Sequence, residues 1–115
     1  MRVVAYIPDL MFGSGVQSAL AAAGHEPVLV GDESALEQEL AGAEVLIVDL
    51  TSDAEQRLQA VGRHREGAVR TLGVYSHVET EVRARAQEAG IDLVVPRSRM
   101  AREGPALVER LARGG

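Results

Sequence analysis

A chain of 115 residues, 46% of them hydrophobic and 25% charged, suits one globular domain over residues 1–115 with one core. The absence of cysteine excludes disulfides, thiolate metal sites and thiol catalysis, and the absence of lysine excludes Schiff-base chemistry. The net charge of −5 conceals an acidic half, residues 1–56, and a basic half, residues 57–115. This asymmetry indicates two solvated faces, an electrostatically directed partner or head-to-tail self-association.

Short apolar segments alternate with helical patterns along the whole chain. The central segment, residues 45–50, is apolar apart from Asp49 and is typical of a strand buried on both faces. Ser34 and Glu37 have the spacing of a helix capping box, and Gly24 is placed to end the first helix. In chain order we expect a strand at 3–7, a loop at 10–15, a helix at 16–23, a strand at 28–30, a helix at 35–40, a strand at 45–50, a helix at 54–64, a strand at 71–75, a helix at 78–89, a strand at 92–96, a loop at 97–103 and a last helix from 104 with Pro105 at its first position.

Five alternations of strand and helix with short connections predict an α/β fold. The strands should form a doubly wound parallel sheet with helices on both faces, because each parallel crossover needs a helix. The expected order is 2-1-3-4-5, the flavodoxin-like winding, whose crevice lies at the carboxyl ends of the strands. That edge would gather these polar residues: Asp9 and Ser14 after the first strand, Asp49 and Thr51 after the third, Ser76 and His77 after the fourth, and Arg97 after the fifth.

With Asp49 ending the third strand and Ser76 following the fourth, the chain resembles the receiver domain of two-component response regulators. The resemblance implies that Asp49 stands at the phosphoacceptor position and Ser76 at that of the sensing hydroxyl. It also implies a divalent metal site, for which Asp9 and Asp49 could hold Mg²⁺ weakly.

The chain departs from the receiver pattern at two places. Residues 7–8 are Ile-Pro where receivers carry an acidic pair, so that Asp9 fits only with a one-residue shift. Val95 stands where receivers carry a lysine, and the nearest cation is Arg97, after the strand 5 proline. Phosphoryl transfer depends on a metal and a cation to neutralise charge. We therefore predict a degenerate, pseudo-receiver module that is not an enzyme and has no cofactor.

Three other interpretations stay open from the sequence. The protein could be a phosphorylatable receiver with Asp49 as the acceptor. It could be a small nucleotide-binding protein, because Gly13-Ser14-Gly15 follows the first strand where a dinucleotide fingerprint would lie. Asp49 could also be purely structural, capping the next helix or accepting hydrogen bonds from loop amides.

The expected partner is a protein or a second copy of the chain. By resemblance, the face formed by the fourth helix, fifth strand and fifth helix is the interface, with Arg83, Arg85, Arg97 and Arg99. Nucleic acid is not expected, because the arginines are interrupted by acids and aromatics make up 3% of the chain. The chain has no signal-peptide pattern and no apolar run of membrane-spanning length, so we expect a cytoplasmic protein.

Overall fold

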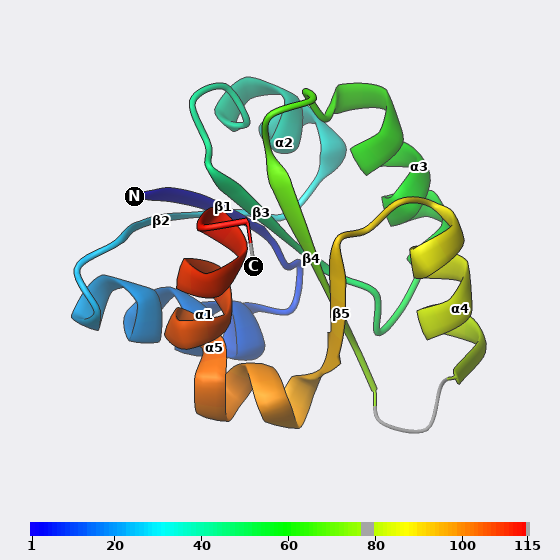
Figure 1. Cartoon of the computed structure of the whole chain (residues 1–115). Helices are drawn as coiled ribbons and strands as arrows, with labels where there is room; N and C mark the ends of the chain where they lie inside the picture. Colours follow the sequence, from blue (N-terminus) through cyan, green and yellow to red (C-terminus); the bar gives the residue numbers. More distant parts are fainter. Residues whose placement is uncertain (77–79, 115) are drawn as a thin grey trace.

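A single five-stranded parallel sheet organises the chain, in the order β2-β1-β3-β4-β5 (Figure 1). The computed structural model describes residues 1–76 and 80–114. All four strand pairs are parallel, as the alternation predicts. The strands are β1 (Arg2–Tyr6), β2 (Glu26–Val30), β3 (Val45–Asp49), β4 (Arg70–Tyr75) and β5 (Leu93–Pro96), each within two residues of its predicted ends.

Five helices cover the two faces of the sheet. Figure 1 shows α1 and α5 together on one side, and α2, α3 and α4 on the other. The fold class and the strand order predicted from the sequence are therefore confirmed. The helices are α1 (Leu10–Ala22), α2 (Glu33–Glu39), α3 (Ala54–His64), α4 (Thr80–Glu88) and α5 (Arg97–Ala112).

The central strand β3 supplies both layers of the core. Val45 and Ile47 pack on the side of α1 and α5, while Leu46 and Val48 pack on the side of α2 and α3. All four are fully buried. Side chains of a strand alternate between faces, so an unbroken apolar strand needs a helical layer on each side. The polar residue that ends this strand is thereby fixed at the carboxyl edge of the sheet.

Helix α1 begins at Leu10, six residues before its predicted start. Asp9 caps it, because the Asp9 side chain accepts hydrogen bonds from the amides of Met11 and Phe12. Gly13 lies inside the helix, at a position where a Cβ would come within 2.8 Å of Leu29 Cδ1 on β2. The close approach of the helix to β2 therefore favours glycine there. The predicted loop at 10–15 is therefore wrong: its glycines are helical, and at least Gly13 serves close packing.

Helix α5 also begins earlier than predicted, at Arg97, directly after β5. Pro105 is therefore inside the helix and not at its first position. Proline lacks the N–H that would bond the carbonyl of Ala101, and Ala101 is exposed, so water can take that bond. Figure 1 shows α5 changing direction between its first and last turns, as an internal proline produces.

The capping box predicted for the second helix is wrong. Asp32 is the N-cap residue of α2, and its Oδ1 accepts a hydrogen bond from the Ala35 amide at 2.8 Å. Gly24 does end the first helical segment as expected, with φ +89. Among the residues described, no helix combines the length and apolar character that crossing a membrane requires.

Candidate functional site

Four polar side chains meet at the carboxyl edge of the sheet, where the sequence places the crevice. Asp49 ends β3, Thr51 follows it, Asp9 caps α1, and Arg97 opens α5 after β5. Asp49 is 2% exposed, although it sits at the end of a strand. A buried carboxylate requires hydrogen-bonding partners, since taking an ion out of water is costly.

Both carboxylate oxygens of Asp49 are engaged within the protein. Oδ1 accepts hydrogen bonds from the Thr51 amide at 3.0 Å and from the Thr51 hydroxyl at 2.5 Å. Oδ2 accepts a hydrogen bond from Arg97 Nη2 at 2.9 Å. The loop-amide interpretation of Asp49 therefore describes one oxygen, while the other belongs to an ion pair that joins β3 to α5.

Arg97 contacts all three other side chains of the site. Its Nη2 also lies 3.2 Å from Asp9 Oδ2, and its Nε donates to Thr51 Oγ1 at 3.0 Å. The guanidinium carbon lies 4.2 Å from the centre of the Phe12 ring, within range of a cation–π interaction. One cation thus connects α1, the end of β3 and the start of α5, and it faces two carboxylates at once.

Asp9 shares its two oxygens between the helix and Arg97. Oδ1 accepts hydrogen bonds from Met11 N at 3.1 Å and Phe12 N at 3.2 Å, while Oδ2 faces Arg97. The hydrogen bond from the Phe12 amide, and then that from Arg97, hold the pKa of Asp9 below its ordinary value against the opposing effect of partial burial. Asp9 is therefore an anion wherever the protein is folded near neutral pH.

Arg57 is a neighbour of the site that was not among the crevice residues expected from the sequence. It is 8% exposed, and its Nη1 donates to the backbone carbonyl of Asp49 at 2.8 Å. Its Nη2 lies 3.4 Å from Ser52 Oγ. Arg57 precedes Leu58 and shares a helix face with Val61, so the spacing of the inner face of α3 could have identified it.

The other predicted crevice residues have different positions. Ser76 follows β4 at the same edge of the sheet and is half-buried. Ser14 lies inside α1 and is exposed, so it forms no phosphate-binding loop with Gly13 and Gly15. His77 lies outside the described residues.

The four arginines of the predicted interface make different contacts. Arg97, which the sequence placed both in the crevice and on the interface, points into the crevice, where it forms ion pairs with Asp9 and Asp49. Arg83 and Arg85 are exposed on α4, where Arg85 forms an ion pair with Glu55 on α3 at 2.6 Å. Arg99 forms an ion pair within α5, 3.5 Å from Glu103. An interface through these four arginines stays a prediction.

The fold and a buried aspartate ending β3 define a class: the chain has the fold of the receiver domains of response regulators. Structures with this fold include a receiver domain of NarL from Mycobacterium tuberculosis, with a TM-score of 0.76 and 24% identity over 99% of this chain and 97% of that one. A Francisella receiver domain has a TM-score of 0.80 and 12% identity over 97% and 96%. An atypical orphan response regulator has a TM-score of 0.79 and 19% identity over 98% and 96%. No family model and no curated protein matches the chain.

The site does not fit the divalent metal that the receiver fold implies. The two carboxylate oxygens that would face such an ion, Asp9 Oδ2 and Asp49 Oδ2, both lie within 3.2 Å of Arg97 Nη2. Within residues 1–76 and 80–114, no three acidic or histidine side chains gather into a metal-binding group. The guanidinium takes the place of the cation between the two acids.

Proposed function

We propose that the protein is a cytoplasmic signalling module with the receiver fold that acts through protein contacts, without catalysis and without phosphoryl transfer to Asp49. The observation that carries this proposal is the engagement of Asp49. Both of its carboxylate oxygens are held by Thr51 and Arg97, and the residue is 2% exposed.

The charge balance of the site supports the same conclusion. Phosphoryl transfer requires positive charge on the equatorial oxygens of the transferring group. Here Arg97 is shared by Asp9 and Asp49, so the four-residue site carries one more negative charge than positive. An incoming phosphoryl group would have to break the Arg97–Asp49 ion pair and would find no other cation offered by these residues.

Solved structures with this fold make such a function reasonable. One is described as an atypical orphan response regulator with a phosphorylation-independent regulatory mechanism, and another as an orphan response regulator of H. pylori. We infer that this chain likewise signals through the surface that it presents. The expected partner is a protein or a second copy of the chain.

The test is incubation of the purified protein with acetyl phosphate and Mg²⁺, followed by intact-mass spectrometry. We expect no phosphoryl adduct on the wild-type chain. An adduct that forms on the wild type and is lost in Asp49→Ala would establish the alternative, a phosphorylatable receiver with Asp49 as acceptor. A standard receiver domain treated in parallel shows that the phosphodonor is active.

A further inference from the structure

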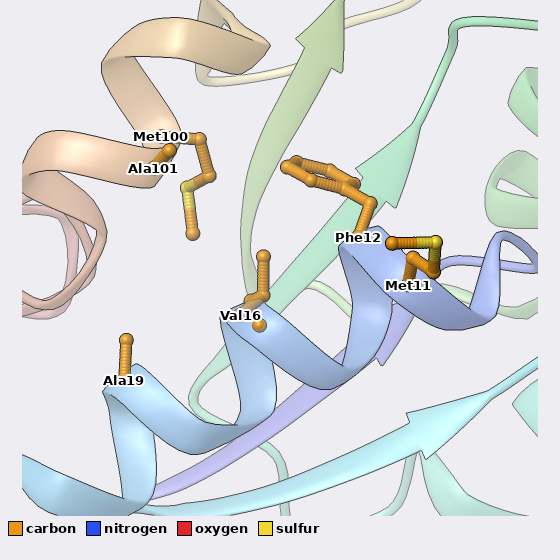
Figure 2. Close-up of a pocket in the computed structure, with 7 residues that line it drawn as sticks. Met11, Phe12, Val16, Ala19, Met100 and Ala101 are labelled. Atoms are coloured by element: carbon orange, nitrogen blue, oxygen red, sulfur yellow. The ribbon is translucent and has the colours of Figure 1, made fainter.

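An apolar groove of about 220 Å³ lies between α1 and α5, and one of its lining side chains also belongs to the crevice. Figure 2 shows Phe12 and Val16 of α1 facing Met100 of α5 across the groove. The other lining residues are Met11, Gly15, Ala19 and Ala101. The Phe12 ring also packs on Arg97, whose guanidinium carbon lies 4.2 Å from the ring centre. One aromatic side chain is therefore shared by the groove and the crevice.

The position of Arg97 depends on Asp49 in two ways. Arg97 Nη2 donates to Asp49 Oδ2 at 2.9 Å, and Arg97 Nε donates to Thr51 Oγ1 at 3.0 Å. Asp49 also holds Thr51 in place, because its Oδ1 accepts hydrogen bonds from the Thr51 amide and hydroxyl. The third partner, Asp9, has a side chain that is 44% exposed, and an exposed ion pair contributes little. Without Asp49, Arg97 would keep only its weakest partner.

The Phe12 ring in turn depends on Arg97. The ring is partly buried against the core layer that lies between the sheet and the helices α1 and α5. A guanidinium over the face of a ring attracts it electrostatically and covers it from water. A guanidinium released from Asp49 no longer covers that face, and the hollow beside the ring gives the ring room to turn. The shape of the groove therefore depends on where Arg97 is held.

We propose that Phe12 and Arg97 couple the crevice to the groove, so that the groove keeps this shape only while Asp49 holds Arg97. Coupling between two sites is reciprocal, so a molecule that displaces the ring from the guanidinium weakens the hold of Asp49 on Arg97. This connection runs through α1 and α5 and does not involve Ser76, the position that the resemblance to receivers assigns to sensing. It does not require phosphoryl transfer, so its failure leaves the proposed function untouched.

The three methionines of the chain make the groove observable by NMR of protein labelled with ¹³C in the methionine methyl groups. Met11 and Met100 line the groove, whereas Met1 does not. Phe12 is the one phenylalanine, and the two tyrosines pack in the core layer on the other face of the sheet. A changed ring current at the Met100 methyl group therefore reports a movement of the Phe12 ring. Phe12→Leu gives the position of the Met100 signal without the ring, and Met11→Leu assigns the signals.

Asp49→Ala releases Arg97 without touching the groove. We expect the Met100 signal of this variant to move from its wild-type position toward that of Phe12→Leu, while the Met1 signal stays in place. Asp49→Asn is the milder variant, and its Met100 signal should move less in the same direction, because the amide oxygen still accepts a hydrogen bond from Arg97. The dispersion of the spectra shows that each variant is folded.

Two controls separate this coupling from a general disturbance of the fold. Arg85→Ala breaks the ion pair with Glu55 between α4 and α3, and it should leave the Met100 signal unchanged. In the Phe12→Leu background, Asp49→Ala should no longer move the Met100 signal, because the ring that reports the change is gone. A Met100 signal that stays at its wild-type position in both Asp49 variants, or that moves equally with and without the Phe12 ring, would overturn the proposal.

Discussion

Arg97 decides the chemistry of the crevice, and its identity matters as well as its charge. A guanidinium offers several donors in one plane, so a single side chain reaches Asp9, Asp49 and Thr51 together. An ammonium is a point charge and could not hold this set in the same way. The sequence predicted that these residues gather at one edge of the sheet. It could not predict the bridge, because that depends on where one long side chain points across 48 and 88 residues of sequence.

Replacing Arg97 by alanine leaves Asp49 buried without a cationic partner. We expect Arg97→Ala to lower the free energy of unfolding by about 2 kcal/mol, the range for a hydrogen-bonded charged group that loses its partner. Urea denaturation at neutral pH measures the change. In an Asp49→Asn background the same substitution should cost markedly less, because the stranded charge is gone. An equal loss in both backgrounds would contradict the role assigned to the pair.

Arg57 binds the main chain at the crevice through the carbonyl of Asp49. Arg57→Met keeps an apolar stem of similar length but removes the hydrogen bond to the Asp49 carbonyl. We expect a loss of about 2 kcal/mol in the free energy of unfolding, because the buried carbonyl is left without its charged donor. Arg83→Met, at an exposed position on α4, should change stability by less than about 0.5 kcal/mol. Urea denaturation of the pair provides the comparison, and similar losses for both would argue against a special role for Arg57.

At the scale of elements, strands were easier to predict than helix starts. Apolar runs such as residues 45–50 report burial directly, so all five strands were found. The starts of α1 and α5 were missed because Gly13, Gly15 and Pro105 have poor helix propensity, which tertiary packing overrides. The close contact of Gly13 with Leu29 lies between different elements, and no local pattern reports it.

The two glycines of α1 should respond differently to alanine. Gly15→Ala should raise the free energy of unfolding by about 1 kcal/mol, because the helix gains propensity and the Cβ meets nothing within 4 Å. Gly13→Ala should fall well short of that gain, since its Cβ would lie 2.8 Å from Leu29 Cδ1 and 3.3 Å from the Ile7 carbonyl oxygen. Thermal and urea unfolding at low protein concentration measure both. A larger gain at Gly13 than at Gly15 would show that this packing is not tight.

Glu33 links α2 to α3 in a pH-dependent way. It accepts hydrogen bonds from Arg63 at 2.7 and 2.8 Å and from His64 at 2.7 Å, and these lower its pKa from 4.5 to about 2. A carboxyl whose pKa is depressed on folding stabilises the protein above its unfolded pKa, and loses that contribution as pH falls toward the folded value.

Glu33→Gln should therefore be less stable than the wild type at pH 6. The difference should shrink between pH 4.5 and pH 2, as the wild-type carboxyl takes up its proton. Urea midpoints measured for both proteins across this range give the comparison. A difference that stays constant down to pH 2 would mean that the ion pair contributes nothing.

For the whole molecule, the charge asymmetry of the sequence has an internal explanation. Arginines of the basic half pair with acids of the acidic half: Arg63 with Glu33, Arg85 with Glu55, and Arg97 with Asp9 and Asp49. The two halves of the sequence are thus joined by ion pairs, both between helices and at the crevice. The asymmetry alone is no argument for an external charged partner.

The central claim is that Asp49 does not accept a phosphoryl group. The most direct test is thermal unfolding with and without Mg²⁺ and beryllofluoride, a phosphoryl mimic, against an Asp49→Ala control. A ligand that binds only the folded chain raises its melting temperature, by an amount equivalent to about 2.7 kcal/mol at 100 times its dissociation constant. Because Arg97 and Thr51 already hold Asp49, we predict no shift for the wild type. A clear rise in the wild type that Asp49→Ala abolishes would contradict the account and establish a site that accepts phosphoryl groups.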